Sequence, residues 1–153
     1  MAQEVEFEIR KLYLKDASLE SPQSPEVFIT MNASPEIDVD INLQQKALNE
    51  ETYYEVVLKV SAEAKHEDKT VFLCEVQQAG VFLIAGIPEE EMQLALNIAC
   101  PNVLLPFARE AISDLVTKAG FPQLLLSPVN FEALFQQQAQ AQAEAEKEKG
   151  AKH

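Results

Sequence analysis

The fold is decided by residues 37–44, which read Ile37-Asp38-Val39-Asp40-Ile41-Asn42-Leu43-Gln44. Aliphatic and polar side chains alternate along this stretch, so an extended chain carries only aliphatic groups on one face and only polar groups on the other. A strand with one dry face and one wet face is typical of an antiparallel sheet that is covered on a single side. Residues 37–44 therefore predict a half-buried strand of such a sheet.

The N-terminal stretch shows the same periodicity with one interruption. Apolar side chains alternate with glutamates over residues 4–9, but Leu12 and Leu14 fall on the opposite parity. This change of parity after Arg10 indicates a bend or a β-bulge in the strand. The serines and prolines of residues 16–25 then predict a loop.

Two further strands are predicted to form a hairpin. Residues 52–64 alternate between apolar and polar side chains, and a second strand is expected from residue 70 to about residue 78. Residues 66–69, His-Glu-Asp-Lys, have the composition of a turn and join the two strands. The first two-thirds of the chain thus predicts three or four antiparallel strands with one solvent-exposed face.

The last third of the chain predicts helices. Pro88 suits a first helical position, and the three carboxylates of residues 89–91 suit the positive end of the helix dipole. Pro101 is expected to end or kink this helix. Pro106 is expected to start another, which ends before Gly120.

A loop without charged residues follows over residues 120–130 and contains three consecutive leucines, residues 124–126. Asn130 is a favourable N-cap for a last helix, whose apolar side chains are Phe131, Leu134 and Phe135. The sequence beyond consists almost entirely of Gln, Ala, Glu and Lys. No apolar stripe holds this tail against a core, so residues 136–153 are expected to be a frayed helix or disordered.

The chain of 153 residues contains 25 acidic and 12 basic side chains, a formal net charge of −13. Nucleic acids and anionic lipids bind clustered cations, so this balance argues against both as partners. Residues 136–153 hold three glutamates and three lysines, so the excess of negative charge belongs to residues 1–135. Those residues are predicted to form a single domain, because a hydrophobic content of 47% is enough for one core.

The expected compartment is the cytoplasm. Residues 1–8 alternate acidic and apolar side chains and lack the basic and apolar regions of a secretory signal. The longest membrane-like run, residues 92–108, is interrupted by two prolines and by amide side chains, and it falls short of the length that a membrane span requires.

No arrangement of residues points to catalysis. His66 lies in the predicted turn and His153 is the last residue, so neither has the setting of a buried base. Cys74 and Cys100 lie in apolar sequence and are expected to be reduced packing residues. Nucleophile, phosphate-loop and zinc motifs are absent from the sequence. An enzyme, a cofactor and a bound metal are therefore not expected.

The chain has more apolar segments than one small core needs. These are the aliphatic row of residues 37–43, the charge-free stretch 76–88 and the leucines of residues 124–126. Packing in the core or in a subunit interface is the ordinary role of each, but a loop with three leucines should cover a core or line a groove. An apolar groove in an acidic surface suits extended, non-native polypeptide. Two alternatives are an enzyme with a pocket for a small apolar ligand, and an acidic scaffold that binds a basic partner without any groove.

Four blocks of the sequence stand out: Tyr54-Glu55-Val56-Val57-Leu58, Phe72-Leu73-Cys74-Glu75-Val76-Gln77-Gln78-Ala79-Gly80-Val81-Phe82, residues 100–110 (CPNVLLPFARE) and residues 121–135 (FPQLLLSPVNFEALF). These blocks resemble the SecB family of protein-export chaperones and occur in the order found in that family. The resemblance extends across roughly residues 5–135, which makes it far more specific than a short motif.

The resemblance implies an α+β subunit, with a four-stranded antiparallel sheet and helices packed on one side, that assembles as a homotetramer, a dimer of dimers. It also implies an ATP-independent chaperone that binds unfolded preproteins and delivers them to the SecA motor of the Sec export pathway. Matching positions imply a SecA-docking surface at Asp16, Glu20, Leu73 and Glu75. Tetramer integrity is associated with the positions of Cys74, Val76 and Gln78.

The groove that holds unfolded clients is expected to be lined by apolar residues of the aliphatic row and of the 121–135 segment. Each buried anchor of this kind contributes about 1.5–3 kcal/mol before ordering costs, so one short segment should bind weakly and several grooves together should bind tightly. The expected lining residues are Val39, Ile41, Phe121, Leu124, Leu126, Phe131 and Phe135.

Overall fold

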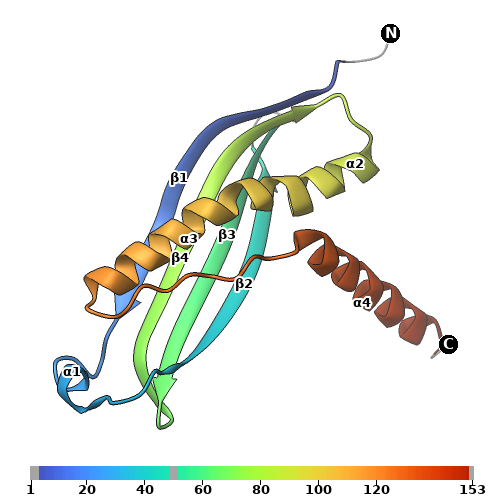
Figure 1. The fold of residues 1–153 in the computed structure, drawn as a ribbon. Coiled ribbons are helices and arrows are strands. Elements are labelled where there is room, and N and C mark those ends of the chain that lie inside the picture. Colours follow the sequence, from blue (N-terminus) through green and yellow to red (C-terminus); the bar gives the residue numbers. More distant parts are fainter. Residues whose placement is uncertain (1–3, 49–51, 152–153) are drawn as a thin grey trace.

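The computed structural model describes residues 4–48 and 52–151 and shows an α+β fold, as predicted (Figure 1). Four antiparallel strands form one sheet in the order β1-β4-β3-β2, and the long helix lies across one of its faces. We call this the covered face and the opposite one the open face. The elements are β1 (Glu6–Glu20), α1 (Val27–Thr30), β2 (Glu36–Ala47), β3 (Tyr53–His66), β4 (Lys69–Ala85), α2 (Glu89–Leu94), the π-helical turn η1 (Ala95–Ala99), α3 (Cys100–Lys118) and α4 (Phe131–Ala151).

The predicted hairpin is confirmed. His66 pairs with Lys69, and the two residues between them, Glu67 and Asp68, have positive φ angles of 53° and 62°. Two consecutive left-handed residues form the tight turn whose twist matches that of the flanking strands. β4 then continues to Ala85, well past the predicted end near residue 78.

The extension of β4 changes the role of the charge-free stretch 76–88. The sequence makes this stretch a candidate for exposed apolar surface, but Val76, Phe82 and Ile84 are all buried. They lie on the covered face of a central strand, where both neighbouring strands and α3 exclude water. Most of the stretch is therefore core.

Strand β1 is longer than predicted, and its irregularities explain why. Its pairing with β4 shifts between Ile9 and Lys11, which confirms the bulge near Arg10, and shifts again between Leu14 and Asp16. The second shift returns the side chains after residue 16 to their original parity, so the strand continues to Glu20. The loop predicted over residues 16–25 is therefore wrong for its first five positions, because one unnoticed bulge hid the alternation.

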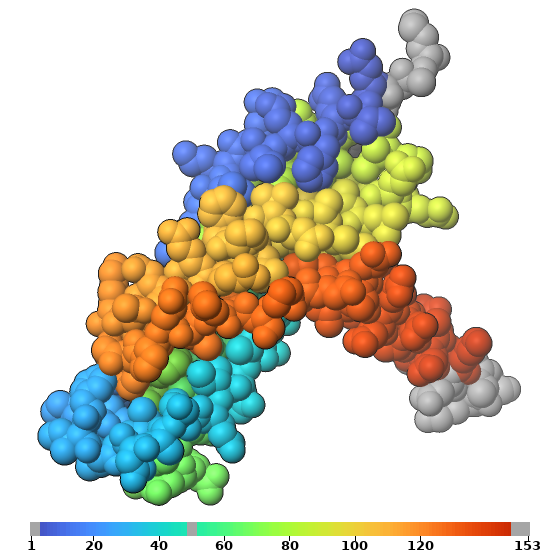
Figure 2. Space-filling model, in the orientation of Figure 1, coloured from blue at the N-terminus to red at the C-terminus, as the bar shows by residue number. Residues whose placement is uncertain are grey.

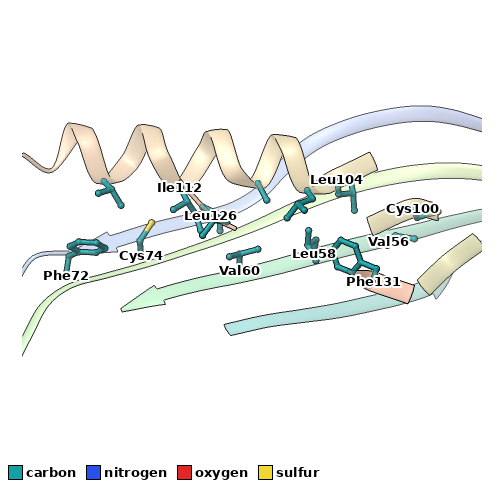
Figure 3. Close-up of a cluster of buried hydrophobic side chains, with 14 of the residues drawn as sticks. Val56, Leu58, Val60, Phe72, Cys74, Cys100, Leu104, Ile112, Leu126 and Phe131 are labelled. Atoms are coloured by element: carbon teal, nitrogen blue, oxygen red, sulfur yellow. The ribbon is translucent and has the colours of Figure 1, made fainter. Parts of the chain in front are cut away.

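The core lies between α3 and the covered face of the sheet (Figure 3). Alternate side chains of β3 and β4 point toward α3, as the period of two requires. Both cysteines are unpaired and buried there, and burial raises the pKa of Cys74 to about 11 and that of Cys100 to about 12. The fully buried large side chains include Val56, Leu58, Val60, Phe72, Phe82, Leu104 and Ile112.

The helix is interrupted just before Pro101, as predicted, but Pro106 does not behave as the sequence predicts. Pro101 lies in the first turn of α3 and is preceded directly by the π-helical turn, which joins α2 to α3. Pro106 lies inside α3, so the predicted restart of a helix at this position is wrong. Asn102, whose carbonyl would accept the missing hydrogen bond of Pro106, is exposed like the proline itself, so water can satisfy it.

The end of α3 is a Schellman motif, as the glycine predicts. Gly120 has a φ of 97°, its amide donates to Thr117 at 3.0 Å, and the Phe121 amide donates to Val116 at 3.2 Å. The reversal directs Phe121 into the core. Its ring centroid lies 5.0 Å from that of Phe72 and 5.3 Å from that of Phe28.

Asn130 caps α4 as predicted, with its Oδ1 accepting from the Ala133 amide at 3.0 Å. Replacing Asn130 by alanine leaves that amide without its partner, so we expect the free energy of unfolding to fall by about 1 kcal/mol. Urea unfolding followed by circular dichroism measures the change. Asn130→Ser, which keeps a capping oxygen, should recover most of the loss, and an equal loss in both variants would contradict the assignment of the cap.

Candidate functional site

The segment from Gly120 to Asn130 crosses the covered face of the sheet from the end of α3 to the side of β2 (Figure 1). In the space-filling view this segment and the start of α4 (orange to red) lie beside β2 (cyan), and the rest of α4 projects away from the body (Figure 2). Two pockets lie along the line where this segment meets β2. We call the two pockets together the β2 groove.

The first pocket, which we call the aromatic pocket, has a volume of about 450 Å³. Its walls come from the chain between α1 and β2, from the start of β2, from β4 and from the crossing segment. The C-terminal turn of α3 is responsible for one wall, because it directs Phe121 against Phe72. The lining residues are 31–35, Ile37, Phe72 and residues 121–124.

The second pocket, which we call the amide pocket, has a volume of about 240 Å³. It lies between the middle of β2 and the first turns of α4, and Asn97 of the π-helical turn contributes to it. Three of its lining side chains are amides, and its surface is more polar than that of the aromatic pocket. The lining residues are Ile41, Asn42, Leu43, Asn97, Phe131, Leu134, Phe135 and Gln138.

Among the residues that the structure describes, no charged side chain lines either pocket, although the chain carries a net charge of −13. The alternation of β2 produces this contrast. Ile37 and Ile41 lie on the covered face, opposite Ala64 and Val60 of β3, while Asp38 and Asp40 lie on the open face. The β2 groove is therefore uncharged on a negatively charged protein, and its aromatic pocket is mainly apolar while its amide pocket is mainly polar.

The structure brings five of the seven expected groove residues into the two pockets. Phe121 and Leu124 line the aromatic pocket, and Ile41, Phe131 and Phe135 line the amide pocket. Val39 is 45% exposed on the same face of β2 but lines neither pocket. Leu126 is only 6% exposed and belongs to the core, where it packs beneath α3.

Sequence reasoning missed several lining residues. Ile37 and Leu43 belong to the aliphatic row that contains Val39 and Ile41, so their alternation was a usable signal. Met31 and Asn97 lie in segments with no periodic pattern, and the sequence alone carries no sign of their position. Only the fold places them beside β2.

The four residues of the expected SecA-docking surface lie together on the open face of β1 and β4. Glu20 pairs with Leu73, Ser18 pairs with Glu75, and Asp16 pairs with Gln77, so all these side chains share one face. Leu73 is 37% exposed, and Glu75 forms an ion pair with Lys59 at 2.7 Å. The result is an exposed leucine surrounded by carboxylates.

A second carboxylate on the open face is held by a lysine and a tyrosine. Lys15 Nζ donates to Glu55 Oε1 at 2.8 Å, and the Tyr13 hydroxyl donates to Oε2. The bond from Lys15, followed by that from Tyr13, lowers the pKa of Glu55, and burial raises the pKa of Tyr13 to about 12.

This arrangement predicts a pH-dependent contribution to stability. A carboxyl group with a depressed folded pKa stabilises the fold above its unfolded pKa and loses that contribution as the pH falls through the folded value. We expect Glu55→Gln to be less stable than the parent by about 1–2 kcal/mol at pH 7, and the difference to vanish well below the ordinary value of 4.5. Urea unfolding across a pH series measures it, and a difference that stays constant with pH would be inconsistent with the ionised pair.

The three positions associated with assembly lie on the covered face of β4, beneath α3. Cys74 and Val76 are completely buried within the subunit, and Gln78 is 6% exposed. Gln78 lines a third pocket, of about 740 Å³, together with Arg109 of α3. Within the described residues the Nε of Arg109 is buried without a hydrogen-bond partner.

The neighbouring edge strand β1 leaves apolar side chains uncovered. Phe7, Ile9 and Leu14 are 43–51% exposed on the covered face, because α3 lies mainly over β3 and β4. The outer backbone edge of β1 also has no partner strand within the described part of the chain. Such an edge is a site where another chain can pair.

None of the helices in residues 4–48 and 52–151 has the length and apolarity needed to cross a bilayer. The same residues bring together no group of three His, Cys, Asp or Glu side chains that could hold a metal ion.

The sequence matches the family model described as "Preprotein translocase subunit SecB" over residues 1–142. The protein-export protein SecB of Hydrogenovibrio crunogenus is 51% identical over 133 residues, which are 87% of this chain and 88% of the relative. The protein-export protein SecB of Neisseria gonorrhoeae is 49% identical over 133 residues, which are 86% of this chain and 89% of the relative.

A solved structure shares the fold at low sequence identity. The Mycobacterium tuberculosis Rv1957 SecB-like chaperone, in complex with a ChAD peptide from the Rv1956 HigA1 antitoxin, aligns with a TM-score of 0.66. The alignment covers 81% of this chain and 91% of that one, with 17% identity, so the likeness concerns the fold.

Proposed function

The chain belongs to the SecB family, and on that premise we propose that it is a protein-export chaperone that binds unfolded preproteins in the β2 groove. The observation that carries this proposal is the uncharged lining of both pockets on a protein of net charge −13. Unfolded chains expose the apolar side chains that such a groove accepts. Binding of this kind requires no nucleotide, because the energy comes from removing apolar surface from water.

The size of the pockets favours weak binding of each segment. The aromatic and amide pockets hold only a few side chains, and the ordering of a flexible client opposes its binding. A long client that occupies several grooves of one assembly converts later contacts into intramolecular ones, which raises the overall affinity. Such binding holds a chain unfolded and still releases it segment by segment.

We therefore propose the homotetramer, a dimer of dimers, as the working form. The exposed apolar side chains of β1 and its unpaired edge, within the described residues, are features that burial against another copy would satisfy. In this proposal Cys74, Val76 and Gln78 support assembly from within, by setting the position of α3 over β4. Sedimentation equilibrium should give four times the mass of the chain, and a stable monomer would contradict the proposal.

We propose that the acidic cluster around Leu73 on the open face docks the SecA motor. Replacing Glu75 by lysine reverses one charge there and places it beside Lys59, so we expect binding to SecA to weaken by about tenfold. Binding of an unfolded client should change little, because the groove lies on the covered face of the sheet beside β2. Surface plasmon resonance against SecA measures the first and client anisotropy the second.

The control for Glu75→Lys is Glu144→Lys, which makes the same change in net charge on the exposed part of α4. Equal losses of SecA binding in both variants would mean that total charge, and not the open face, attracts the motor. An equal loss of client binding in Glu75→Lys, with the assembly intact, would mean that the two surfaces are not separate.

The chaperone proposal is tested by the aggregation of an unfolded precursor without nucleotide. Stoichiometric amounts of the protein should suppress light scattering, and the suppression should persist in high salt, because apolar burial is not screened. The alternative, an acidic scaffold without a client groove, is favoured by the carboxylates of the open face. It predicts that binding of every ligand disappears in high salt.

A further inference from the structure

The long helix contains one π-helical turn, Ala95–Ala99, within the described residues. The amide of Cys100 donates to the carbonyl of Ala95, five residues earlier. Pro101 follows at once and has no amide hydrogen for the Asn97 carbonyl, so one α-helical hydrogen bond is missing directly after the π-helical turn. Single π turns within α-helices are frequent at functional sites.

The side chain of Asn97 connects this turn to the sheet. Its Oδ1 accepts a hydrogen bond from Gln45 Nε2 at 2.8 Å, and its Nδ2 donates to the carbonyl of Gln93 at 2.8 Å. Gln45 lies on the covered face of β2, opposite Val56 of β3. The side-chain amide of Asn97 therefore joins the π-helical turn to β2, an edge strand of the sheet.

The same side chain lines the amide pocket. The opposite wall of that pocket comes from Phe131 and Phe135 of α4, and α4 contacts the π-helical turn. The position of the π-helical turn relative to β2 thus determines where Asn97 lies in the pocket and where α4, which carries Phe131 and Phe135, is supported.

We propose that Asn97 is a positioning residue for client binding: its bond to Gln45 fixes the π-helical turn against β2 and so preforms the amide pocket. The inference rests on the proposed function of the β2 groove and adds a specific determinant of its shape. A preformed pocket binds more tightly than one that the client must order.

The first test is the affinity for a fluorescently labelled, reduced and carboxymethylated lactalbumin, which cannot fold. Asn97→Ala should weaken binding by about 3–10-fold, the value of the one hydrogen bond that joins the π-helical turn to β2. Asn102→Ala changes an exposed asparagine of the same helix that does not line the amide pocket, and it should bind as the parent does. If Asn97→Ala is poorly folded, Gln45→Ala removes the same bond from the strand side.

Two further measurements distinguish positioning of the amide pocket from a role of Asn97 in folding alone: recovery of affinity in an exchanged pair, and additivity of the losses in double variants. The exchanged pair Gln45→Asn with Asn97→Gln keeps the combined length of the two side chains and should recover most of the affinity. The loss in Asn97→Ala should be non-additive with Phe135→Ala in the amide pocket and additive with Leu124→Ala in the aromatic pocket.

Unchanged client affinity in Asn97→Ala, while Phe135→Ala and Leu124→Ala both weaken binding, would overturn the inference and leave the groove in place. Full additivity with Phe135→Ala would overturn it as well. If Phe135→Ala and Leu124→Ala also bind normally, the groove itself is wrong and the inference fails with it.

Discussion

Replacing Phe121 by alanine should lower the free energy of unfolding by about 3–5 kcal/mol, a large share of the stability of a single domain. The ring is 5% exposed and packs between Phe28 and Phe72, so its removal leaves a cavity lined by aromatic rings. It also follows the Schellman motif at Gly120, which directs the crossing segment toward β2. The same substitution should therefore weaken client binding as well as folding.

Urea unfolding followed by circular dichroism measures the loss of stability. The matched control is Leu125→Ala in the same segment, because Leu125 is 66% exposed and its removal should change stability by no more than about 0.5 kcal/mol. Equal changes in the two variants would mean that the crossing segment does not pack as the structure shows.

Replacing Ile37 by aspartate should weaken client binding by about tenfold to a hundredfold. Ile37 lines the aromatic pocket, which contains no other charged side chain, and a carboxylate there must be desolvated when a client covers it. Since the isoleucine is 40% exposed in the free protein, the aspartate can remain hydrated and the fold should survive. Anisotropy of an unfolded, labelled client measures the affinity.

The control for Ile37→Asp is Gln44→Asp, which adds the same charge to the open face of the same strand. Client affinity should be nearly unchanged in this variant. If both variants lose affinity equally, repulsion by total charge would explain the result and the groove would not be needed.

Alternation of side chains predicted the sheet well wherever the strands are regular. Residues 37–44 and the 66–69 turn carried enough local information to fix β2 and the β3–β4 hairpin. The same rule failed at the second bulge of β1, because a shift of one residue exchanges the two faces. It also ended β4 too early, since a central strand buried on both faces loses its polar positions.

The local rule for proline held at Pro101, where the α-helix is interrupted, and failed at Pro106, because it ignores tertiary support. Pro101 and Pro106 each lack a backbone donor, and sequence rules predict that a helix ends or kinks at such residues. In the structure the π-helical turn accommodates the missing donor of Pro101, and the exposed side of α3 accommodates that of Pro106. Packing of the helix on the sheet provides the energy that local propensity lacks.

The site was predictable only in part. Aromatic and aliphatic residues of the 121–135 segment were recognisable as groove candidates because a loop rarely holds so many of them. Leu124 and Leu126 illustrate the limit, since one lines the aromatic pocket and the other lies in the core. Which of two nearby leucines faces solvent depends on the path of the loop, and no periodicity encodes that path.

The sheet provides two separate surfaces because its strands alternate. Ile37, Ile41 and Leu43 of β2 face the helices and line the groove, while Asp38 and Asp40 face the other side. We propose that this separation lets the protein hold a client on one face and dock a motor on the other. Charge changes on the open face should therefore alter encounter with the motor more than retention of the client.

Site-specific photocrosslinking to an unfolded client shows whether the client binds in the β2 groove or on the open face. A photoreactive amino acid is placed in turn at Ile37, at Leu124 and, as the open-face control, at Ser61 of β3. If the client binds in the β2 groove, we expect strong crosslinks from positions 37 and 124 and only background from position 61. Crosslinks that are strongest from position 61, or absent from both groove positions while the client remains bound, would contradict it.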